Sequence, residues 1–174
     1  MMRFKAIRIF YISLLVSSFL APESYAKTAE PINLTIDFTL PKINTEPYHR
    51  PYVAIWLETP EREGIHTLVF WHEQQEWFKD LRQWWRKIGR KASANYDGVS
   101  GATKKPNSYQ VSWQGQLTNS EMLPQGEYTL NFEAVREEGS REYLKQKIRW
   151  DNKQPQHYQL QGQTELGAIT ITIE

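Results

Sequence analysis

The feature that most constrains the fold is a strict alternation of apolar and polar residues that recurs along the chain. Residues 32–40 and 168–173 alternate without a break, which is the period of a strand with one buried face. Residues 52–58 are apolar on both faces, as in the central strand of a sheet. Together with the turn residues between segments, these patterns predict strands at 32–40, 52–58, 65–71, 109–113, 127–134, 142–150, 157–160 and 168–173.

A change of period predicts one helix at residues 73–88. Its apolar residues fall on one helical face and are Trp77, Leu81, Trp84, Trp85 and Ile88. Gly89 follows as a natural C-terminal cap. Short strands, polar turns and one amphipathic helix predict a mainly β protein, an antiparallel immunoglobulin-like β-sandwich of seven or eight strands.

The N-terminus has the three parts of an export signal. Basic residues at 3, 5 and 8 precede a mostly apolar run at 9–20, and Ser24-Tyr25-Ala26 is a small-x-small cleavage site. The apolar run is too short to span a bilayer comfortably. We expect cleavage after Ala26, a short leader at 27–31, a single domain at 32–174 and no transmembrane span after cleavage. A retained N-terminal anchor is the alternative.

The composition excludes several kinds of site. The chain has no Cys, so it has no disulfide, no thiolate metal site and no c-type haem. Its four His are scattered and predict no metal site. A net charge of +1 gives no reason to expect nucleic-acid binding. The chain has no hydrolase nucleophile elbow and no phosphate loop, so we assign no catalytic residue.

The segment Asp97-Gly98-Val99-Ser100-Gly101-Ala102-Thr103 is the main candidate site. It resembles the acceptor motif of bacterial flavin transferases, Asp-x-x-Ser/Thr-Gly-Ala-Thr/Ser. The resemblance implies that Thr103 receives FMN through a phosphoester bond and that Asp97, Ser100, Gly101 and Ala102 form the recognition frame. We expect a reachable loop of small residues. The alternative is a plain connecting turn, because Asp-Gly and Ser-Gly are ordinary turn dipeptides.

Residues near this motif are candidate contacts for a flavin. Trp84, Trp85 and Tyr96 are candidates to stack on the isoalloxazine ring. Trp84 and Trp85 are neighbours on a helix, so one of them is expected to be partly exposed and to be the better contact. Basic residues are candidates for the flavin phosphate, for an acidic partner or for anionic lipid, or form a solvated helix face; they are Arg86, Lys87, Lys104 and Lys105.

Several segments together resemble domain of unknown function 2271, a family of predicted periplasmic proteins of bacteria. They are residues 52–58, 66–71, 81–85, 97–103, 123–128 and 133–139. The resemblance implies a location outside the cytoplasm. It also implies a flavin transferase and a membrane electron-transfer protein with a PepSY domain as partners.

Two functions follow as expectations. The first is a periplasmic electron carrier with covalent FMN on Thr103, which is the substrate of a transferase and does no bond-making chemistry itself. The second is a non-catalytic, immunoglobulin-like periplasmic binding module without a cofactor.

Overall fold

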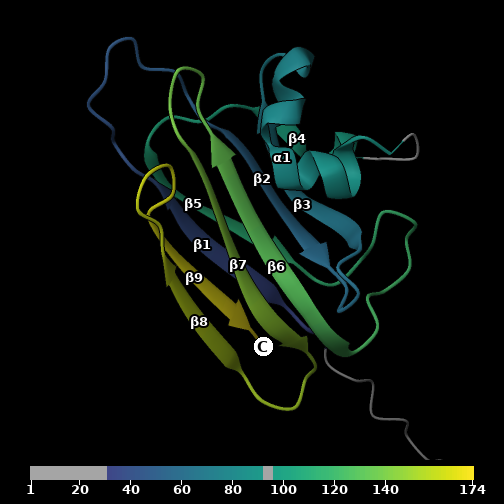
Figure 1. Cartoon of the computed structure of the whole chain (residues 1–174). Coiled ribbons are helices and arrows are strands. Elements are labelled where there is room, and N and C mark those ends of the chain that lie inside the picture. Colours follow the sequence, from purple (N-terminus) through teal and green to yellow (C-terminus); the bar gives the residue numbers. More distant parts are fainter. Residues whose placement is uncertain (1–30, 92–95) are drawn as a thin grey trace, which may run out of the picture.

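The computed structural model describes residues 31–91 and 96–174, so the predicted signal peptide and cleavage site lie outside the described residues. The described chain forms two sheets that face each other (Figure 1). One has the strand order β5-β1-β9-β8 and the other β4-β3-β2-β6-β7. The strands are β1 (Leu34–Leu40), β2 (Tyr52–Glu58), β3 (Gly64–His72), β4 (Ser100–Ala102), β5 (Asn107–Trp113), β6 (Gly126–Val135), β7 (Arg141–Trp150), β8 (Gln156–Gln161) and β9 (Ala168–Ile173).

The predicted mainly β sandwich is confirmed, and all eight predicted strands are present. Their ends differ from the predicted ones by at most two residues: β1 begins at Leu34 and β5 at Asn107, while β2 and β9 match their predicted ranges. The ninth strand, β4, lies inside the acceptor motif (residues 97–103), where the sequence predicts a loop. It pairs in parallel with β3, while the other strand pairs of the described chain are antiparallel.

The principal core lies between the two sheets. Leu34, Ile36 and Phe38 alternate along β1 and are at most 1% exposed. They belong to one apolar cluster with Ile55 of β2 and Phe132 of β6, which come from the opposite sheet. The alternation of β1 predicts its buried face correctly, because every second side chain meets the facing sheet.

A second, aromatic core covers the outer face of β2 and β3. Trp56 of β2 and Phe70 of β3 belong to the same buried cluster as Trp84, which comes from a helical segment over this sheet (Figure 1). The rings of Trp84 and Phe70 stack with their centroids 4.0 Å apart. β2 is therefore buried along its whole length, as its continuous apolar pattern predicts.

The helical segment is not the continuous helix that the period predicts. It consists of the 3-10 helix η1 (Gln75–Asp80), the single turn α1 (Arg82–Trp84) and the π-helix η2 (Trp85–Gly89). Leu81 separates the first two with a non-helical ψ of 69°. The buried carboxylate of Glu133 accepts hydrogen bonds from the backbone N–H groups of Gln83 and Trp84, which starts a new helix there.

Gly89 is not the C-terminal cap that the sequence predicts. It is the last residue of η2, and the capping residue after it is Arg90, whose φ of −80° is right-handed. A Cβ at Gly89 would lie 2.5 Å from the Trp84 ring. Glycine is needed at this position because the backbone approaches an aromatic ring closely.

Among the described residues, no helix has the length and apolar character to cross a membrane.

Candidate functional site

The acceptor motif ends at the edge of the five-stranded sheet. β4 (Ser100–Ala102) pairs in parallel with the end of β3, with His72 opposite Ala102. Both strands leave the sheet at the same end because they run in parallel, and this brings the next residues, Glu73 and Thr103, together. The hydroxyl of Thr103 donates a hydrogen bond of 2.5 Å to Oε1 of Glu73.

Thr103 is enclosed, which contradicts the prediction of a reachable acceptor. Its exposure is only 3%, while Ala102 before it, Lys104 after it and Glu73 are exposed. The prediction failed because small residues and Asp suggested a free loop, whereas pairing with β3 fixes the segment. A reaction at the Thr103 hydroxyl therefore requires the end of β4 to move away from Glu73.

The other residues of the motif hold its backbone. The Ser100 hydroxyl donates a 2.8 Å hydrogen bond to the backbone oxygen of Tyr96, and Val99 N–H donates to the same oxygen. Gly101 lies beside the Trp71 ring, which is 3.4 Å from the position of an added Cβ. Asp97 begins the short 3-10 helix η3 (Asp97–Val99); its side chain lies outside the described part of the structure.

The predicted aromatic contacts separate into core and surface residues. Trp84 is fully buried and donates its indole N–H to the Thr67 hydroxyl at 3.1 Å. A ring enclosed in this way cannot stack on a flavin, so the predicted contact for Trp84 is wrong in this conformation. Trp85 is half-buried, and one of the two adjacent tryptophans is partly exposed as predicted. Tyr96 packs edge-on against Phe70 with the centroids 5.0 Å apart.

An aromatic side chain that sequence reasoning missed lies directly beside the motif. Trp71 of β3 lies opposite Gly101 of β4, and Lys104 Nζ lies 5.7 Å from the centroid of its ring. Tyr109 of β5 meets the same ring edge-on at 5.0 Å. The parallel pairing of β3 with β4 creates this contact, and no sequence signal predicts that pairing.

The predicted basic residues are not gathered around Thr103. Arg86 is exposed and its guanidinium bonds to the side-chain oxygen of Gln83, while Lys87 Nζ donates to the backbone oxygen of Arg62. Lys87 thus ties the helical segment to the β2–β3 turn. Of the predicted basic contacts, only Lys104 and Lys105 adjoin the acceptor residue in the chain.

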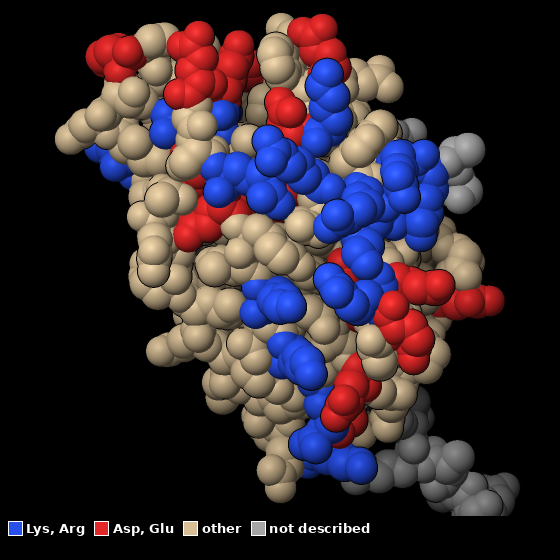
Figure 2. All heavy atoms as spheres, viewed as in Figure 1, with Lys and Arg blue, Asp and Glu red and all other residues tan. Residues whose placement is uncertain are grey.

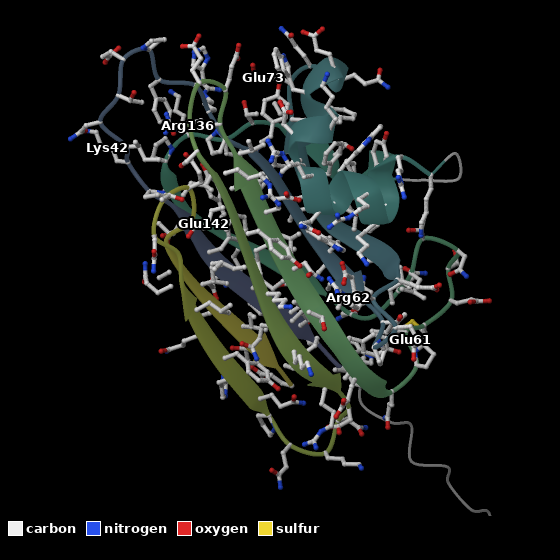
Figure 3. All side chains as sticks on the ribbon, in the orientation of Figure 1. Lys42, Glu61, Arg62, Glu73, Arg136 and Glu142 are labelled. Atoms are coloured by element: carbon white, nitrogen blue, oxygen red, sulfur yellow. The ribbon has the colours of Figure 1, made fainter. Side chains whose placement is uncertain are left out.

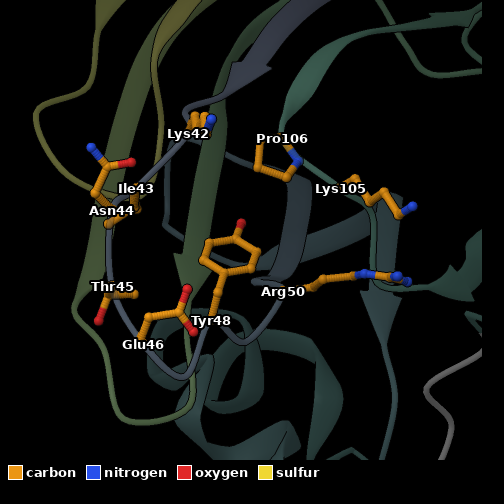
Figure 4. Close-up of a pocket in the computed structure, with 9 residues that line it drawn as sticks. All are labelled: Lys42, Ile43, Asn44, Thr45, Glu46, Tyr48, Arg50, Lys105 and Pro106. Carbon is orange, nitrogen blue, oxygen red and sulfur yellow. The ribbon is translucent and has the colours of Figure 1, made fainter.

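A cleft lies beside Lys105 and Pro106, which follow the acceptor motif in the chain. Its volume of about 730 Å³ is within the range of roughly 300–1,000 Å³ for ligand pockets. We call it the loop cleft, because the long β1–β2 loop forms most of its wall and Lys105 and Pro106 form the rest. Its lining residues are Lys42, Ile43, Asn44, Thr45, Glu46, Tyr48, Arg50, Lys105 and Pro106 (Figure 4). Figure 3 shows Lys42 of this cleft and Glu73 at the same end of the sandwich.

The loop cleft carries more positive than negative charge. Lys42, Arg50 and Lys105 line it against a single carboxylate, Glu46. Within residues 31–91 and 96–174, none of these three cations forms an ion pair. Their charges are therefore available to an anionic ligand.

Tyr48 is the aromatic ring of the loop cleft, and it is held from one side. The Arg136 guanidinium lies 5.7 Å from its ring centroid and forms a buried ion pair of 3.0 Å with Glu165. Burial raises the pKa of Tyr48, and the Arg136 charge opposes that rise. The phenol is therefore neutral at physiological pH.

A second cleft, the cationic groove, runs along β7 on the same outer sheet face that carries the helical segment. It has a volume of about 660 Å³. Four cations line it, Arg62, Lys145, Lys147 and Arg149, together with two carboxylates, Glu58 and Glu127, and three tyrosines, Tyr128, Tyr143 and Tyr158. Arg149 forms an ion pair with Asp151. Figure 2 shows Lys and Arg gathered in a band on this face of the molecule. β1, β5, β8 and β9, which form the other sheet, contain no Lys or Arg.

Comparison with known proteins gives a family. No curated protein and no solved structure matches the chain significantly. The family model described as predicted periplasmic protein (DUF2271) matches residues 33–168, which include every strand from β1 to β8. The chain therefore belongs to the DUF2271 family of predicted periplasmic proteins.

Proposed function

We propose that this protein is a periplasmic electron carrier that holds FMN covalently on Thr103, attached by a separate flavin transferase. One observation supports the proposal best: the hydroxyl that ends the acceptor motif lies two residues before Lys105, a wall residue of the loop cleft. Thr103 bonds to Glu73, which lies at the same end of the sandwich as Lys42 of the loop cleft (Figure 3).

The residues present fit a covalently held flavin. Ala102 and Gly98 are exposed and Gly101 has no Cβ, so a transferase meets little steric bulk along the motif. Lys104 and Lys105, both exposed, are close enough in the chain to neutralise a phosphoester on Thr103. When bound, the flavin supplies reversible electron transfer.

Attachment at Thr103 is a phosphoryl-type transfer. The Thr103 oxygen forms a bond to the phosphorus of the FMN half of FAD, the bond between that phosphorus and the bridging oxygen breaks, and AMP leaves with the electron pair. The hydroxyl proton passes to a base of the transferase, because a Thr hydroxyl is a weak nucleophile without a base and a metal. The products are the FMN phosphoester of Thr103 and AMP.

The end of β4 is suited to the movement that this step needs. β4 has only three residues, lies at the edge of its sheet and pairs with β3 alone. Edge segments with few backbone hydrogen bonds open at low cost compared with global unfolding. After attachment, Thr103 has no hydrogen to donate, and its phosphoester is an anion beside the Glu73 carboxylate. Repulsion between these charges keeps the modified residue outward.

The cationic groove and the exposed Arg86 are the surface that we assign to an acidic face of a redox partner. The family resemblance names a membrane electron-transfer protein with a PepSY domain as that partner. Long-range charge steering raises association rates without a large buried interface, which suits a carrier that must also dissociate.

The second candidate function is a binding module without a cofactor. The observation that favours it is the cationic groove, in which three tyrosines and four cations line one cleft with only two carboxylates. Such a surface is able to bind an anionic partner whether or not Thr103 is modified. The two functions differ in a simple property, because a protein that carries flavin is yellow and a cofactor-free module is colourless.

The test is the intact mass of the mature protein after co-expression with a periplasmic flavin transferase. We expect the wild type and Thr103→Ser to gain one FMN less one water, and Thr103→Val to gain nothing. Thr164→Val is the matched control, since Thr164 also donates its hydroxyl to a glutamate, Glu142, outside the motif. It should be modified like the wild type. An unmodified wild type, beside a known acceptor that is modified, would make the binding module the leading function.

A further inference from the structure

We infer that the loop cleft receives the isoalloxazine ring of the flavin on Thr103, and that Arg50 and Lys105 stabilise the reduced, anionic flavin there. The inference rests on the proposed function, since it concerns the group attached to Thr103. It adds the position of the ring and the residues that set its redox potential.

The first argument is reach. Lys105 follows Thr103 by two residues, so their Cα atoms are at most about 7 Å apart. The phosphate and ribityl chain of FMN form a flexible linker between Thr103 and the ring. A tether of this kind holds the ring at a high effective concentration near the cleft, so that even a modest intrinsic affinity fills it.

The second argument is the shape of the loop cleft. Figure 4 shows the Tyr48 ring in the middle of the cleft, with residues 42–45 on one side and Arg50 and Lys105 on the other. The Arg136 guanidinium lies over the Tyr48 ring, 5.7 Å from its centroid, which favours this orientation of the ring before any ligand arrives. A planar ring system gains most from a flat aromatic surface that is already oriented. The apolar side chains of Ile43 and Pro106 add contact area.

The third argument is charge. Two-electron reduction of FMN with uptake of one proton gives a hydroquinone whose negative charge lies on the N1–C2 carbonyl edge of the ring; the redox partner supplies the electrons. Arg50 and Lys105 have no ion-pair partner in the described chain. Cations near this edge favour the reduced state, which raises the reduction potential.

The experiment compares the midpoint potential of flavinylated wild type with that of Arg50→Gln/Lys105→Gln. Intact mass, read from the same samples, reports attachment separately. We expect both proteins to carry flavin and the double variant to favour the oxidised state at least tenfold more, which is about 30 mV for a two-electron couple. Lys153→Gln is the control. It removes an exposed cation in the β7–β8 turn, and its potential should equal that of the wild type.

A second variant tests the ring contact. Tyr48→Leu removes the aromatic surface while keeping an apolar side chain, and we expect the flavin fluorescence to rise because stacking on tyrosine quenches it. Equal potentials in wild type and double variant, together with unchanged fluorescence in Tyr48→Leu, would overturn the inference while leaving attachment at Thr103 intact.

Failure of the proposed function gives a different result. If the wild type acquires no flavin, attachment at Thr103 is wrong, and the loop cleft is then tested with free FMN at millimolar concentration. Saturable quenching that weakens at least tenfold in Arg50→Gln/Lys105→Gln would retain the cleft as a flavin site. FMN fluorescence that the protein leaves unchanged would remove it.

Discussion

At the scale of single residues, the hydrogen bond from Thr103 to Glu73 restrains the hydroxyl that we propose as the flavin acceptor. The acceptor oxygen is buried, while the glutamate that holds it is exposed. Hydrogen bonds to charged groups are among the stronger ones, but exposure of one partner weakens them. We propose that this hydrogen bond to Glu73 keeps Thr103 in place until a transferase binds.

We expect Glu73→Gln to be flavinylated faster than wild type, because a neutral amide holds the hydroxyl less strongly and does not repel the phosphoester. The measurement is the time course of modification by purified transferase and FAD, followed by intact mass. Glu76→Gln is the control, since Glu76 is also exposed and lies three residues further along. Slower modification of Glu73→Gln would show that the carboxylate assists the reaction.

Glu142 organises the β8–β9 loop by a different arrangement. Its carboxylate accepts backbone N–H hydrogen bonds of 2.6–3.0 Å from four consecutive residues, 163–166. Burial raises the pKa of Glu142, but the backbone N–H groups of Gln163, Leu166 and Thr164 outweigh burial and lower it. The ionised carboxylate is therefore the form that stabilises the fold.

We expect Glu142→Gln to lower the free energy of unfolding by about 1–2 kcal/mol at pH 7. The folded pKa lies below the unfolded value of about 4.3, so the contribution of Glu142 is complete above that pH and is lost as the pH falls through the folded pKa. Denaturant unfolding at pH 7 and in acid checks this. The difference between wild type and variant should shrink in acid, and a constant difference would contradict the assignment.

At the scale of elements, the helical segment is shaped by the sheet beneath it. Glu133 of β6 ends one helix and starts another by accepting the N–H groups of Gln83 and Trp84. Arg141 of β7 balances the buried carboxylate at 2.6 Å. The amphipathic period correctly predicted that Leu81, Trp84 and Ile88 are buried. Trp77 and Trp85 of the same predicted face are only half-buried, and the period missed the buried Phe78 and the break at Leu81.

The close contact between Gly89 and the Trp84 ring in this segment can be tested by substitution. Gly89→Ala places a methyl group 2.5 Å from the Trp84 ring, and overpacking of this kind costs about 1–3 kcal/mol. Gly98→Ala is the matched control, because no atom lies within 4 Å of the added Cβ, and its cost should stay within about 0.5 kcal/mol. Chemical denaturation measures both. Equal stabilities for the two variants would contradict the close contact at Gly89.

At the scale of the whole molecule, charge is segregated although the net charge is only +1. The cations of the cationic groove lie on one face (Figure 2), and the strands of the opposite sheet contribute no Lys or Arg. An acidic partner attracts the cationic face more strongly than the opposite face, so this charge distribution orients the protein as the two approach each other. Screening by salt acts over about 8 Å at physiological ionic strength, so the effect depends strongly on salt.

We expect Lys147→Gln to slow reduction of the flavinylated protein by inner-membrane vesicles several-fold at low salt and little at high salt. Ser112→Asp changes the net charge by the same amount on an exposed position of β5, in the other sheet, and should have a smaller effect. If both variants behave alike at every salt concentration, net charge and not the cationic groove determines the rate.

Much of the fold was predictable because the apolar pattern of a strand depends only on residues that are close together in the sequence. The alternation along β1 and β9 and the continuous apolar run of β2 correctly predicted which faces are buried. The candidate site was only partly predictable. The motif indicated Thr103, yet the loop cleft depends on Tyr48 and Arg50, which come from a long loop without a periodic pattern.

The sequence by itself determined eight of the nine strands of the described chain, most of the apolar face of the helical segment and the acceptor-like motif, because each is a property of residues close together in the chain. Only the tertiary structure decided that Thr103 meets Glu73 across 30 positions and that Glu133 divides the helix from 49 positions away. Contacts of this kind depend on how the sheets order their strands. A local pattern specifies that a strand forms. It does not specify which strand pairs with it, and so it does not predict which distant side chains come into contact.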